Sequence, residues 1–479
     1  MNGYVLVLLL YSGALILLGV LASRSVRAAA DFFVARRSLG AGRLCATLLA
    51  ANIGAGSTVG AAGLGYDFGL SGWWWVGSAG LGSLILAFLV GPRIWTVVAQ
   101  RGFYTVGDYL EYRYGRAVRG LIAVILWIGS LAILAGQWIA VAWIMNVIAG
   151  LSKPLGCVLG GIVTILYFAV GGLVSAAWVN LVQVIVKLSG FALALSWALE
   201  YVGGWAGLRE TILAREAFGS GYFGIVGSSW DHALGYVVLL APAFIVSPGL
   251  VQKVYGARSR RAVQIGVGAN ACVLLLFAFL PVMMGMAARA VHPDLENREL
   301  ALPTALVSML PAWLGVLLLA AIFSAEVSSA DAVLFMLSTS LAQDLYKTFV
   351  RPNASERELL RVSQWAAVVA GTLGVIFAIK LPSIISALSI FYTLLSVALF
   401  APLVLGLFSS RPKERDALAA IVLALLVTGG AHWATGGRGV AVLTPVALGL
   451  LVSFGVMLRA FARRGQETLS ESLSGRGAP

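Results

Sequence analysis

The chain has 479 residues, of which 60% are hydrophobic and only 11% are charged. This composition excludes a soluble enzyme, a disordered chain and a disulfide scaffold. At about 20 apolar residues for each spanning helix, it could supply about 13 or 14 transmembrane helices. Membrane barrels alternate apolar and polar residues, whereas this chain has apolar runs of helix length, so we expect an all-α polytopic membrane protein.

The net charge is +13, which in a soluble protein would suggest nucleic acid. Here the basic residues gather in alternate loops, such as 24–37, 258–261 and 411–415, which the positive-inside rule makes cytoplasmic. No basic residue precedes the first apolar run, 4–22, so this run is predicted to be a retained helix and not a signal peptide. We therefore expect a bacterial inner membrane or plasma membrane protein, with its N-terminus outside, its C-terminus cytoplasmic and no nucleic-acid partner.

Apolar stretches separated by charge predict about 13 helices. The three cysteines lie in apolar segments and the three histidines at segment ends, so neither disulfides nor a haem or metal enzyme is expected. The predicted helices cover residues 3–22, 40–68, 72–98, 117–148, 153–174, 177–202, 234–255, 262–290, 304–342, 360–380, 384–408, 416–434 and 440–462.

Two of these helices are predicted to be broken. Five glycines surround Ser57 and Thr58 between residues 54 and 65, and each costs helix stability, while Pro242 and Pro248 interrupt the helix at 234–255. Each broken helix begins a block of five, 40–202 and 234–408, and an odd number of helices inverts the second block. Unless the breaks are ordinary packing kinks, the pattern indicates a secondary transporter with a midplane site.

The remaining segments flank these two repeats within one transmembrane domain. They are an extra N-terminal helix and cytoplasmic loop at 1–39, two peripheral helices at 409–462 and a disordered cytoplasmic tail at 463–479.

The most polar intramembrane stretch is in the predicted helix 304–342. Ser324, Glu326, Ser328, Ser329 and Asp331 lie within eight residues, with apolar sequence on both sides. Polar groups at that depth face a cavity, an ion or one another. Hydroxyl and carboxylate oxygens suit an alkali cation, although serines can also bond back to their own helix.

Several ordered stretches resemble the sodium:solute symporter family, whose bacterial members include proline, pantothenate, sialic acid and sugar symporters. They are DFFVARRSLG at 31–40, the glycine-rich segment 50–65, YTVGDYLEYRYG at 104–115, YFAVGGLVSAAWVNLVQ at 167–183, GLVQK at 249–253, and 325–347 with its paired serines and its ending QDLYK. The resemblance implies the leucine-transporter type of 5+5 inverted-repeat fold with an extra N-terminal helix. It also implies alternating access driven by Na⁺.

Carried over by position, the resemblance implies a sodium site with ligands from both helices. Its backbone carbonyls come from Ala50, Ile53 and Ala325, and its hydroxyls from Ser328 and Ser329. A second cation site of some members corresponds to Asn180, Ser328 and Asp331, where the usual acid of the first position is an amide.

We expect the solute, a small organic molecule, near the two breaks. The predicted contacts are Asn52, Gly56, Ser57, Lys187, Pro248 and Gly249. The sugar symporters of the family carry an acid and an amide where this chain has Gly56 and Ser57, so an amino acid or a carboxylate is favoured over a sugar. For Lys187 three interpretations remain: it pairs with Asp331 or Glu326, it binds an anionic solute, or it replaces a cation.

Sodium-coupled import of a small solute is therefore the predicted function. The alternatives are proton-coupled or uncoupled transport by the same fold, with Asp331 or Lys187 titrating, and a membrane sensor that has lost transport. The chain carries no nucleophile motif and no attached soluble domain that would favour an enzyme or a sensor.

Overall fold

The structure, a computed structural model, describes residues 37–474 apart from 216–219 and 441–442, together with residues 6, 10 and 13. The side chains of residues 166–183, 220, 324, 328, 461 and 463–474 are not described. The predicted helix at 3–22 therefore lies almost wholly outside the description. Of the tail predicted to be disordered, 463–479, residues 463–474 are helical and only 475–479 lie outside the description.

The first predicted block begins with a helix that is interrupted as expected. Helix α3 (Ala41–Asn52) ends at the glycine-rich segment, a short turn η2 (Ala55–Ser57) follows, and α4 (Val59–Phe68) resumes the helix. The following elements are η3 (Gly69–Gly72), α5 (Trp73–Ile85), η4 (Leu86–Val90), α6 (Gly91–Arg101), α7 (Val106–Tyr114), α8 (Arg116–Ala149) and α9 (Lys153–Tyr201).

One boundary of this block differs from the prediction. We expected two helices, at 153–174 and 177–202, but the structure assigns Lys153–Tyr201 to the single element α9. The sequence between them offers a glycine pair but neither a proline nor a charge, so nothing in it requires a helix to end. The predicted count of 13 helices is accordingly not confirmed.

The second block also opens on an interrupted helix. α11 (Trp230–Val246) ends at Ser247, and α12 (Pro248–Tyr255) begins at the proline that cannot donate a backbone hydrogen bond. The other elements from the outer loop onward are α10 (Gly204–Leu213), η5 (Ser220–Phe223), α13 (Arg260–Phe277), α14 (Phe279–Val291), η6 (Arg298–Leu300), α15 (Ala301–Ser308), α16 (Ala312–Thr339), η7 (Ser340–Val350), α17 (Glu356–Lys380), α18 (Ile384–Leu394), η8 (Leu395–Leu399), α19 (Phe400–Phe408), α20 (Glu414–Thr435) and α21 (Pro445–Ser474).

The helix that we predicted at 304–342 is divided. Residues 301–308 form the short α15, and α16 begins only after Pro311, which occupies its N-cap position. A proline cannot continue the preceding helix but is tolerated at a helix start. The polar stretch of Glu326, Ser329 and Asp331 therefore lies near the middle of α16.

Nine helical stretches within the described residues are long and apolar enough to cross a membrane. This confirms the all-α polytopic fold. The stretches are Ala55–Arg101, Arg116–Ala149, Val184–Tyr201, Trp230–Tyr255, Arg260–Val291, Ala312–Val350, Glu356–Lys380, Ile384–Phe408 and Glu414–Thr435.

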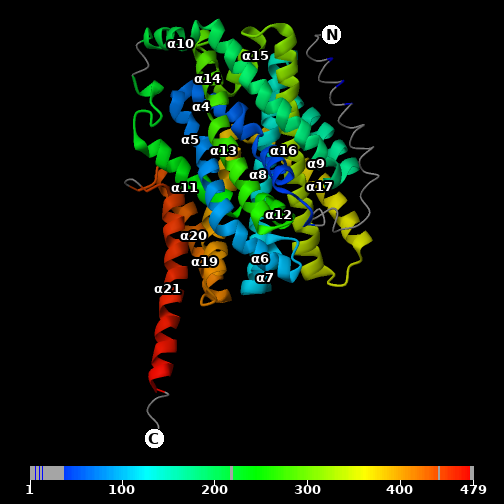
Figure 1. The fold of residues 1–479 in the computed structure, drawn as a ribbon, viewed down its shortest axis with the longest axis vertical. Helices are drawn as coiled ribbons and strands as arrows, with labels where there is room; N and C mark the ends of the chain where they lie inside the picture. The colour runs from blue at the N-terminus through cyan, green and yellow to red at the C-terminus, as the bar shows by residue number, and fades with distance from the viewer. Residues whose placement is uncertain are drawn as a thin grey trace.

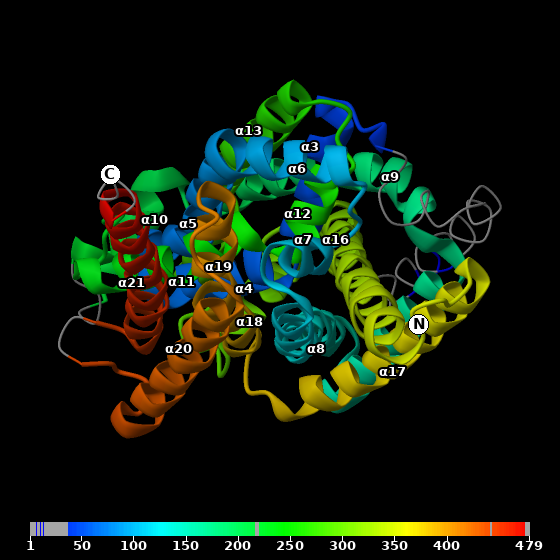
Figure 2. The ribbon, with the colours of Figure 1, turned by 90° about the horizontal axis from the view of Figure 1, so that it is seen from below.

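The helices run roughly along one axis of the molecule. Figure 1 shows α10 and α15 at one end and α6 and α7 at the opposite end, with α20 and α21 along one side. Seen along the axis, α8, α12 and α16 lie near the middle, while α17 and α21 are peripheral (Figure 2). The second half of one broken helix, α12, and the polar α16 are therefore central.

Close helix contact depends on glycine where α4 meets α14. A Cβ atom added at Gly285 would lie 1.8 Å from the Ala62 carbonyl oxygen, and one added at Gly65 would lie 2.1 Å from that of Val282. Small residues allow such backbone approach in membrane proteins. This packing holds α4, the second half of the broken helix, against the second repeat.

A buried arginine ties together three elements at the α6 and α7 end. Arg119 of α8 contacts Asp108 and Glu111 of α7 at 2.9 and 2.6 Å, and Asp344 of η7 at 2.8 Å. Burial raises the pKa of Glu111, but hydrogen bonds and charge from Arg119 and Arg116 outweigh it and hold that pKa below its usual value. The Glu111 contribution to stability is thus present above its unfolded pKa and is lost on acidification.

We predict that Arg119→Leu lowers stability by about 3–5 kcal/mol, because it leaves the buried Asp344 carboxylate and the half-buried Asp108 and Glu111 carboxylates without their cation. The matched control is Arg116→Leu, which removes a 71% exposed partner of the same Glu111 and should cost less than about 1 kcal/mol. Thermal unfolding of the purified proteins in detergent measures both. Equal unfolding midpoints for the two variants would contradict the assignment.

Candidate functional site

The break in α3 exposes backbone groups that side chains then satisfy. Ile53 (φ −94°, ψ 86°) and Gly54 (φ −140°, ψ −160°) leave the helical conformation. The Ser57 hydroxyl lies 2.8 Å from the Asn52 carbonyl oxygen and accepts the Gly54 N–H at 3.0 Å. Gln137 of α8 accepts the Ala55 N–H at 2.9 Å. Ser57, predicted as a solute contact, thus also stabilises the break.

The hydroxyl of Ser329 on α16 faces the carbonyls of this break. Its Oγ lies 3.3 Å from the Ala50 oxygen and 3.4 Å from the Ile53 oxygen. A Cβ atom at Gly54 would lie 2.3 Å from the same Oγ, so glycine is needed for the approach. Ala325, one helical turn before Ser329, is fully buried. Three of the five predicted sodium ligands are therefore brought together, and the side chain of the fourth, Ser328, lies outside the description.

Two ionisable side chains are buried beside these oxygens. Lys187 of α9 places its Nζ 3.3 Å from the Ile53 carbonyl oxygen. Glu326 of α16 accepts a hydrogen bond from the Thr58 hydroxyl at 2.7 Å and interacts electrostatically with Lys187. Both residues are fully buried. Of the two carboxylates predicted as partners of Lys187, Glu326 is the one that interacts with it electrostatically, while the Lys187 Nζ donates to the Ile53 carbonyl.

The break between α11 and α12 lies opposite the break that follows α3. Lys253 of α12 donates to the Gly249 carbonyl at 3.3 Å and interacts electrostatically with Asp331 of α16. The predicted second cation site needs Asn180 and Ser328 together with Asp331. The side chains of Asn180 and Ser328 are not described, so the second cation site stays a prediction.

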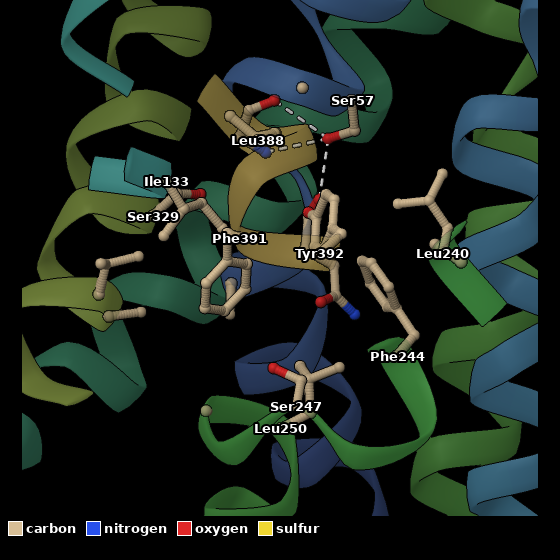
Figure 3. Close-up of a pocket in the computed structure, with 18 of the residues that line it drawn as sticks. Ser57, Ile133, Leu240, Phe244, Ser247, Leu250, Ser329, Leu388, Phe391 and Tyr392 are labelled. Atoms are coloured by element: carbon tan, nitrogen blue, oxygen red, sulfur yellow. Dashed lines mark hydrogen bonds between the residues drawn. The ribbon is translucent and has the colours of Figure 1, made fainter. Parts of the chain in front are cut away.

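A cavity lies between the two breaks and is lined largely by apolar and aromatic side chains. In Figure 3, Tyr392 and Phe244 lie side by side, with Ser57 on one side and Ser247 on the other. The two rings are 5.5 Å apart at their centroids, and Trp75 lies 5.9 Å from Tyr392. The polar lining residues are Asn52, Ser57, Gln137, Ser247, Lys253 and Ser329.

Four of the six predicted solute contacts line this cavity, namely Asn52, Gly56, Ser57 and Gly249. Lys187 does not line it, because its side chain is enclosed beside Ile53. Pro248 borders a smaller neighbouring cavity that contains Thr105, Gln252 and Asp344. The assignment of these two residues as solute contacts is therefore not supported by their positions.

Several lining residues were missed by the sequence reasoning. Gln137 carries a signal, since it is an amide in the middle of a long apolar run. Trp75, Phe244, Phe391 and Tyr392 carry none, because aromatic residues are common throughout the chain. The role of Leu388 could not be predicted from the sequence either. Its two methyl groups fill the spaces beside Gly56 and Gly136, where a Cβ atom would lie 2.3 Å and 2.2 Å from them, respectively.

Comparison with known proteins identifies relatives along almost the whole chain. A sodium:solute symporter family model matches residues 32–424. The chain is 25% identical to a sodium/glucose cotransporter of Vibrio parahaemolyticus, over 88% of this chain and 83% of that protein. It is 27% identical to the sodium/pantothenate symporter of Escherichia coli, over 82% of each.

Solved structures show the same fold. A Na⁺-coupled sialic acid symporter in a substrate-bound outward-open state superposes with a TM-score of 0.81 at 19% identity, over 95% of this chain and 97% of that one. Mhp1, a nucleobase-cation-symport-1 family transporter, gives 0.61 at 14% identity, over 91% and 95%. Because the family model spans most of the sequence and the broken helices match the fold, this chain is a member of the sodium:solute symporter family and a membrane transporter.

Proposed function

We propose that this protein imports a small organic solute together with Na⁺ by alternating access. The Na⁺ would bind the carbonyls of Ala50, Ile53 and Ala325 and the hydroxyls of Ser328 and Ser329. The observation that carries the proposal is the convergence of the Ser329 hydroxyl on two freed carbonyls, at 3.3 and 3.4 Å. Such hard oxygen ligands can replace the hydration shell of an alkali cation.

The orientation follows from the charge of one end of the molecule. Basic loops meet at the α6 and α7 end, where Arg37 donates to Ala99 and Phe103, and Arg113 donates to Gly406 and Ser409. The positive-inside rule makes this end cytoplasmic. Solute would therefore enter from the α10 and α15 end in a bacterial inner membrane or plasma membrane.

One Na⁺ is energetically sufficient for concentrative uptake. Its passage down about 100 mV releases about 2.3 kcal/mol, and a tenfold concentration gradient adds about 1.4 kcal/mol. Full coupling would accumulate the solute roughly 500-fold. Proton coupling is the second candidate, and it is favoured by the Lys187 ammonium at the Ile53 carbonyl.

We predict that Ser329→Ala raises the Na⁺ concentration for half-maximal uptake by about tenfold or more, because it removes one oxygen ligand. Uptake is measured in proteoliposomes, with choline replacing Na⁺. The control is Ser338→Ala on the same helix, whose hydroxyl bonds the Phe335 carbonyl of its own turn at 3.0 Å and should leave the Na⁺ dependence unchanged. An unaltered Na⁺ dependence in Ser329→Ala would refute the assigned site.

For the solute we propose an amino acid or another carboxylate. The cavity offers aromatic rings for an apolar body and Lys253 for an anionic group. A Cβ atom at Gly56 would lie 2.3 Å from a Leu388 methyl group, so a Glu or Gln at this position would require Leu388 to move. A polyol would leave several hydroxyls unpaired against these walls.

We predict that amino acids or carboxylates raise the unfolding temperature only when Na⁺ is present, whereas polyols and nucleosides do not. A thermal-shift screen of the purified protein in sodium or choline chloride measures this. If a polyol stabilised the protein and no amino acid or carboxylate did, the proposed solute class would be contradicted.

Lys253 gives a sharper prediction for the acid identified in that screen. Lys253→Gln should weaken its binding about tenfold, as expected for a lost charge-assisted hydrogen bond, and should spare the primary amide of the same solute. Asp331→Asn should strengthen binding of the acid, because Asp331 competes for the Lys253 ammonium. Equal losses for acid and amide in Lys253→Gln would instead indicate a structural role.

A further inference from the structure

A second cavity lies next to the solute cavity, toward the α6 and α7 end. It is bounded by the start of α7, by α8, by α12 and by the end of α16 with η7. Figure 2, which views the molecule from this end, shows α7, α8, α12 and α16 gathered near the middle. The cavity has a volume of about 20 Å³, and a polar cavity needs roughly 10–15 Å³ to hold one water molecule. This chamber, as we call it, is thus large enough for water but too small for an organic solute.

Four polar side-chain atoms of the chamber lining are buried without a hydrogen-bond partner among the described residues. They are Nε2 of Gln252, Nε1 of Trp127 and the hydroxyl oxygens of Thr339 and Ser340. Gln252, Thr339 and Ser340 are each more than nine-tenths buried. Buried polar groups cost free energy unless they are paired with protein or with ordered water. Because the set contains both donors and acceptors, it suits water, which both donates and accepts.

One side chain separates the chamber from the solute cavity. Among the described residues, only Met336 of α16 lines both. A Cβ atom added at Gly249 would lie 3.6 Å from the Met336 sulfur, so the thioether lies against the first turn of α12. That short helix presents Gly249 and Lys253 to the solute cavity, and Pro248 and Gln252 to the chamber. Since methionine is unbranched and flexible, its side chain can move aside without a change of the backbone.

The opposite side of the chamber is closed by the network around Arg119. Asp344 of η7 lines the chamber, and its Oδ1 accepts the Thr105 hydroxyl at 2.7 Å and contacts Arg119 at 2.8 Å. A Cβ atom added at Gly107 would lie 2.4 Å from the same oxygen, so α7 lies close against η7. The basic loops of this end are those that the positive-inside rule makes cytoplasmic. The chamber therefore lies between the solute cavity and the cytoplasm, with a side-chain contact closing each side.

We propose that the chamber binds water and is the first part of the route by which solute and Na⁺ leave for the cytoplasm, with Met336 as the barrier to the solute cavity. This inference rests on the import proposed above and adds the route of release. When α12 and α16 move apart, Gln252, Thr339 and Ser340 bond water or the polar groups of the departing solute. A charged solute then crosses no dry layer on its way to the cytoplasm.

Cysteine labelling tests the position of the chamber. In a protein that lacks its three native cysteines, Thr339→Cys should react from the cytoplasmic side with a membrane-impermeant, positively charged methanethiosulfonate. The matched control is Ser338→Cys, since Ser338 is fully buried, bonds the Phe335 carbonyl of its own turn and lines neither cavity. Reaction at residue 339 should be at least about tenfold faster, because only that thiol meets water. Gln252→Cys, on the facing helix α12, serves in its place if Thr339→Cys does not fold.

The barrier is tested by a second substitution in the same labelled protein. Adding Met336→Ala to Thr339→Cys should speed labelling from the outer side about tenfold, because the solute cavity and the chamber then communicate. Met336→Leu conserves volume and should leave the outer-side rate unchanged. An outer-side rate that is the same with alanine and with leucine would show that Met336 is not the barrier.

Transport kinetics distinguish a release route from a structural role. Gln252→Leu with Thr339→Val removes polar atoms from the chamber, and neither residue lines the solute cavity. The Kd values of Na⁺ and of the solute found by thermal shift should be unchanged, while the maximal uptake rate in proteoliposomes falls about tenfold. The control is Thr164→Val, whose buried hydroxyl bonds the Gly160 carbonyl of its own helix at 2.9 Å and should change neither quantity.

The outcomes separate this inference from the proposed function. Equal labelling of Thr339→Cys and Ser338→Cys, with Na⁺-driven uptake intact, overturns the release route and leaves sodium coupling standing. An unchanged uptake rate in the Gln252→Leu, Thr339→Val variant makes the chamber a sealed site for structural water and also overturns the route. Cytoplasmic labelling of Thr339→Cys in a protein whose uptake is indifferent to Na⁺ supports the route and overturns sodium coupling.

Discussion

The structure depends on how the backbone groups freed by the break in α3 are satisfied inside the membrane. Helix hydrogen bonds end at Asn52 and resume at Val59, and the intervening carbonyls and amides cannot turn to water or lipid. Four side chains meet them: Ser57 within the break, Gln137 from α8, Ser329 from α16 and Lys187 from α9. The break is therefore one of the places where the two repeats meet, and any ligand that competes for its carbonyls acts on the packing of several helices together.

Charge balance is the second constraint on the same region. Helix α16 carries the buried carboxylate of Glu326 and the half-buried carboxylate of Asp331. Each interacts electrostatically with a lysine from a different helix: Glu326 with Lys187 of α9, and Asp331 with Lys253 of α12. Charges at membrane depth are tolerated when they are paired or face a cavity. Because the two lysines belong to α9 and to a broken helix, the pairs connect α16 to elements on both sides of the cavity.

Much of this architecture could be predicted from the sequence, but not the depth or direction of single side chains. The glycines between residues 54 and 65 and Pro248 predicted both breaks. The free-energy cost of glycine or proline in a helix depends on the local sequence alone, so it can be recognised without a structure. The proximity of Ser329 to Ala50 and Ile53 was predicted from the family resemblance and not from the spacing of residues. The boundary at Pro311 was missed because apolar sequence runs through it, and the expected division of α9 has no proline or charge to mark it. The position of Lys187 depends on which helix faces the break, which periodicity does not specify. For that reason its three interpretations could be narrowed only by tertiary structure.

The shape of the cavity explains why family membership does not fix the solute. Leu388 of α18 extends its two methyl groups into the spaces beside Gly56 on η2 and Gly136 on α8. Both glycines leave room for this leucine in its present position, and a larger residue at either site requires the leucine methyl groups to move. A relative with a polar side chain at the position of Gly56 would need the leucine to move or a smaller residue in its place, and its cavity would present hydrogen-bonding groups where this one presents a methyl group. The ion site is built largely from backbone carbonyls and can persist through such exchanges, whereas the solute site is built from side chains and changes with each of them.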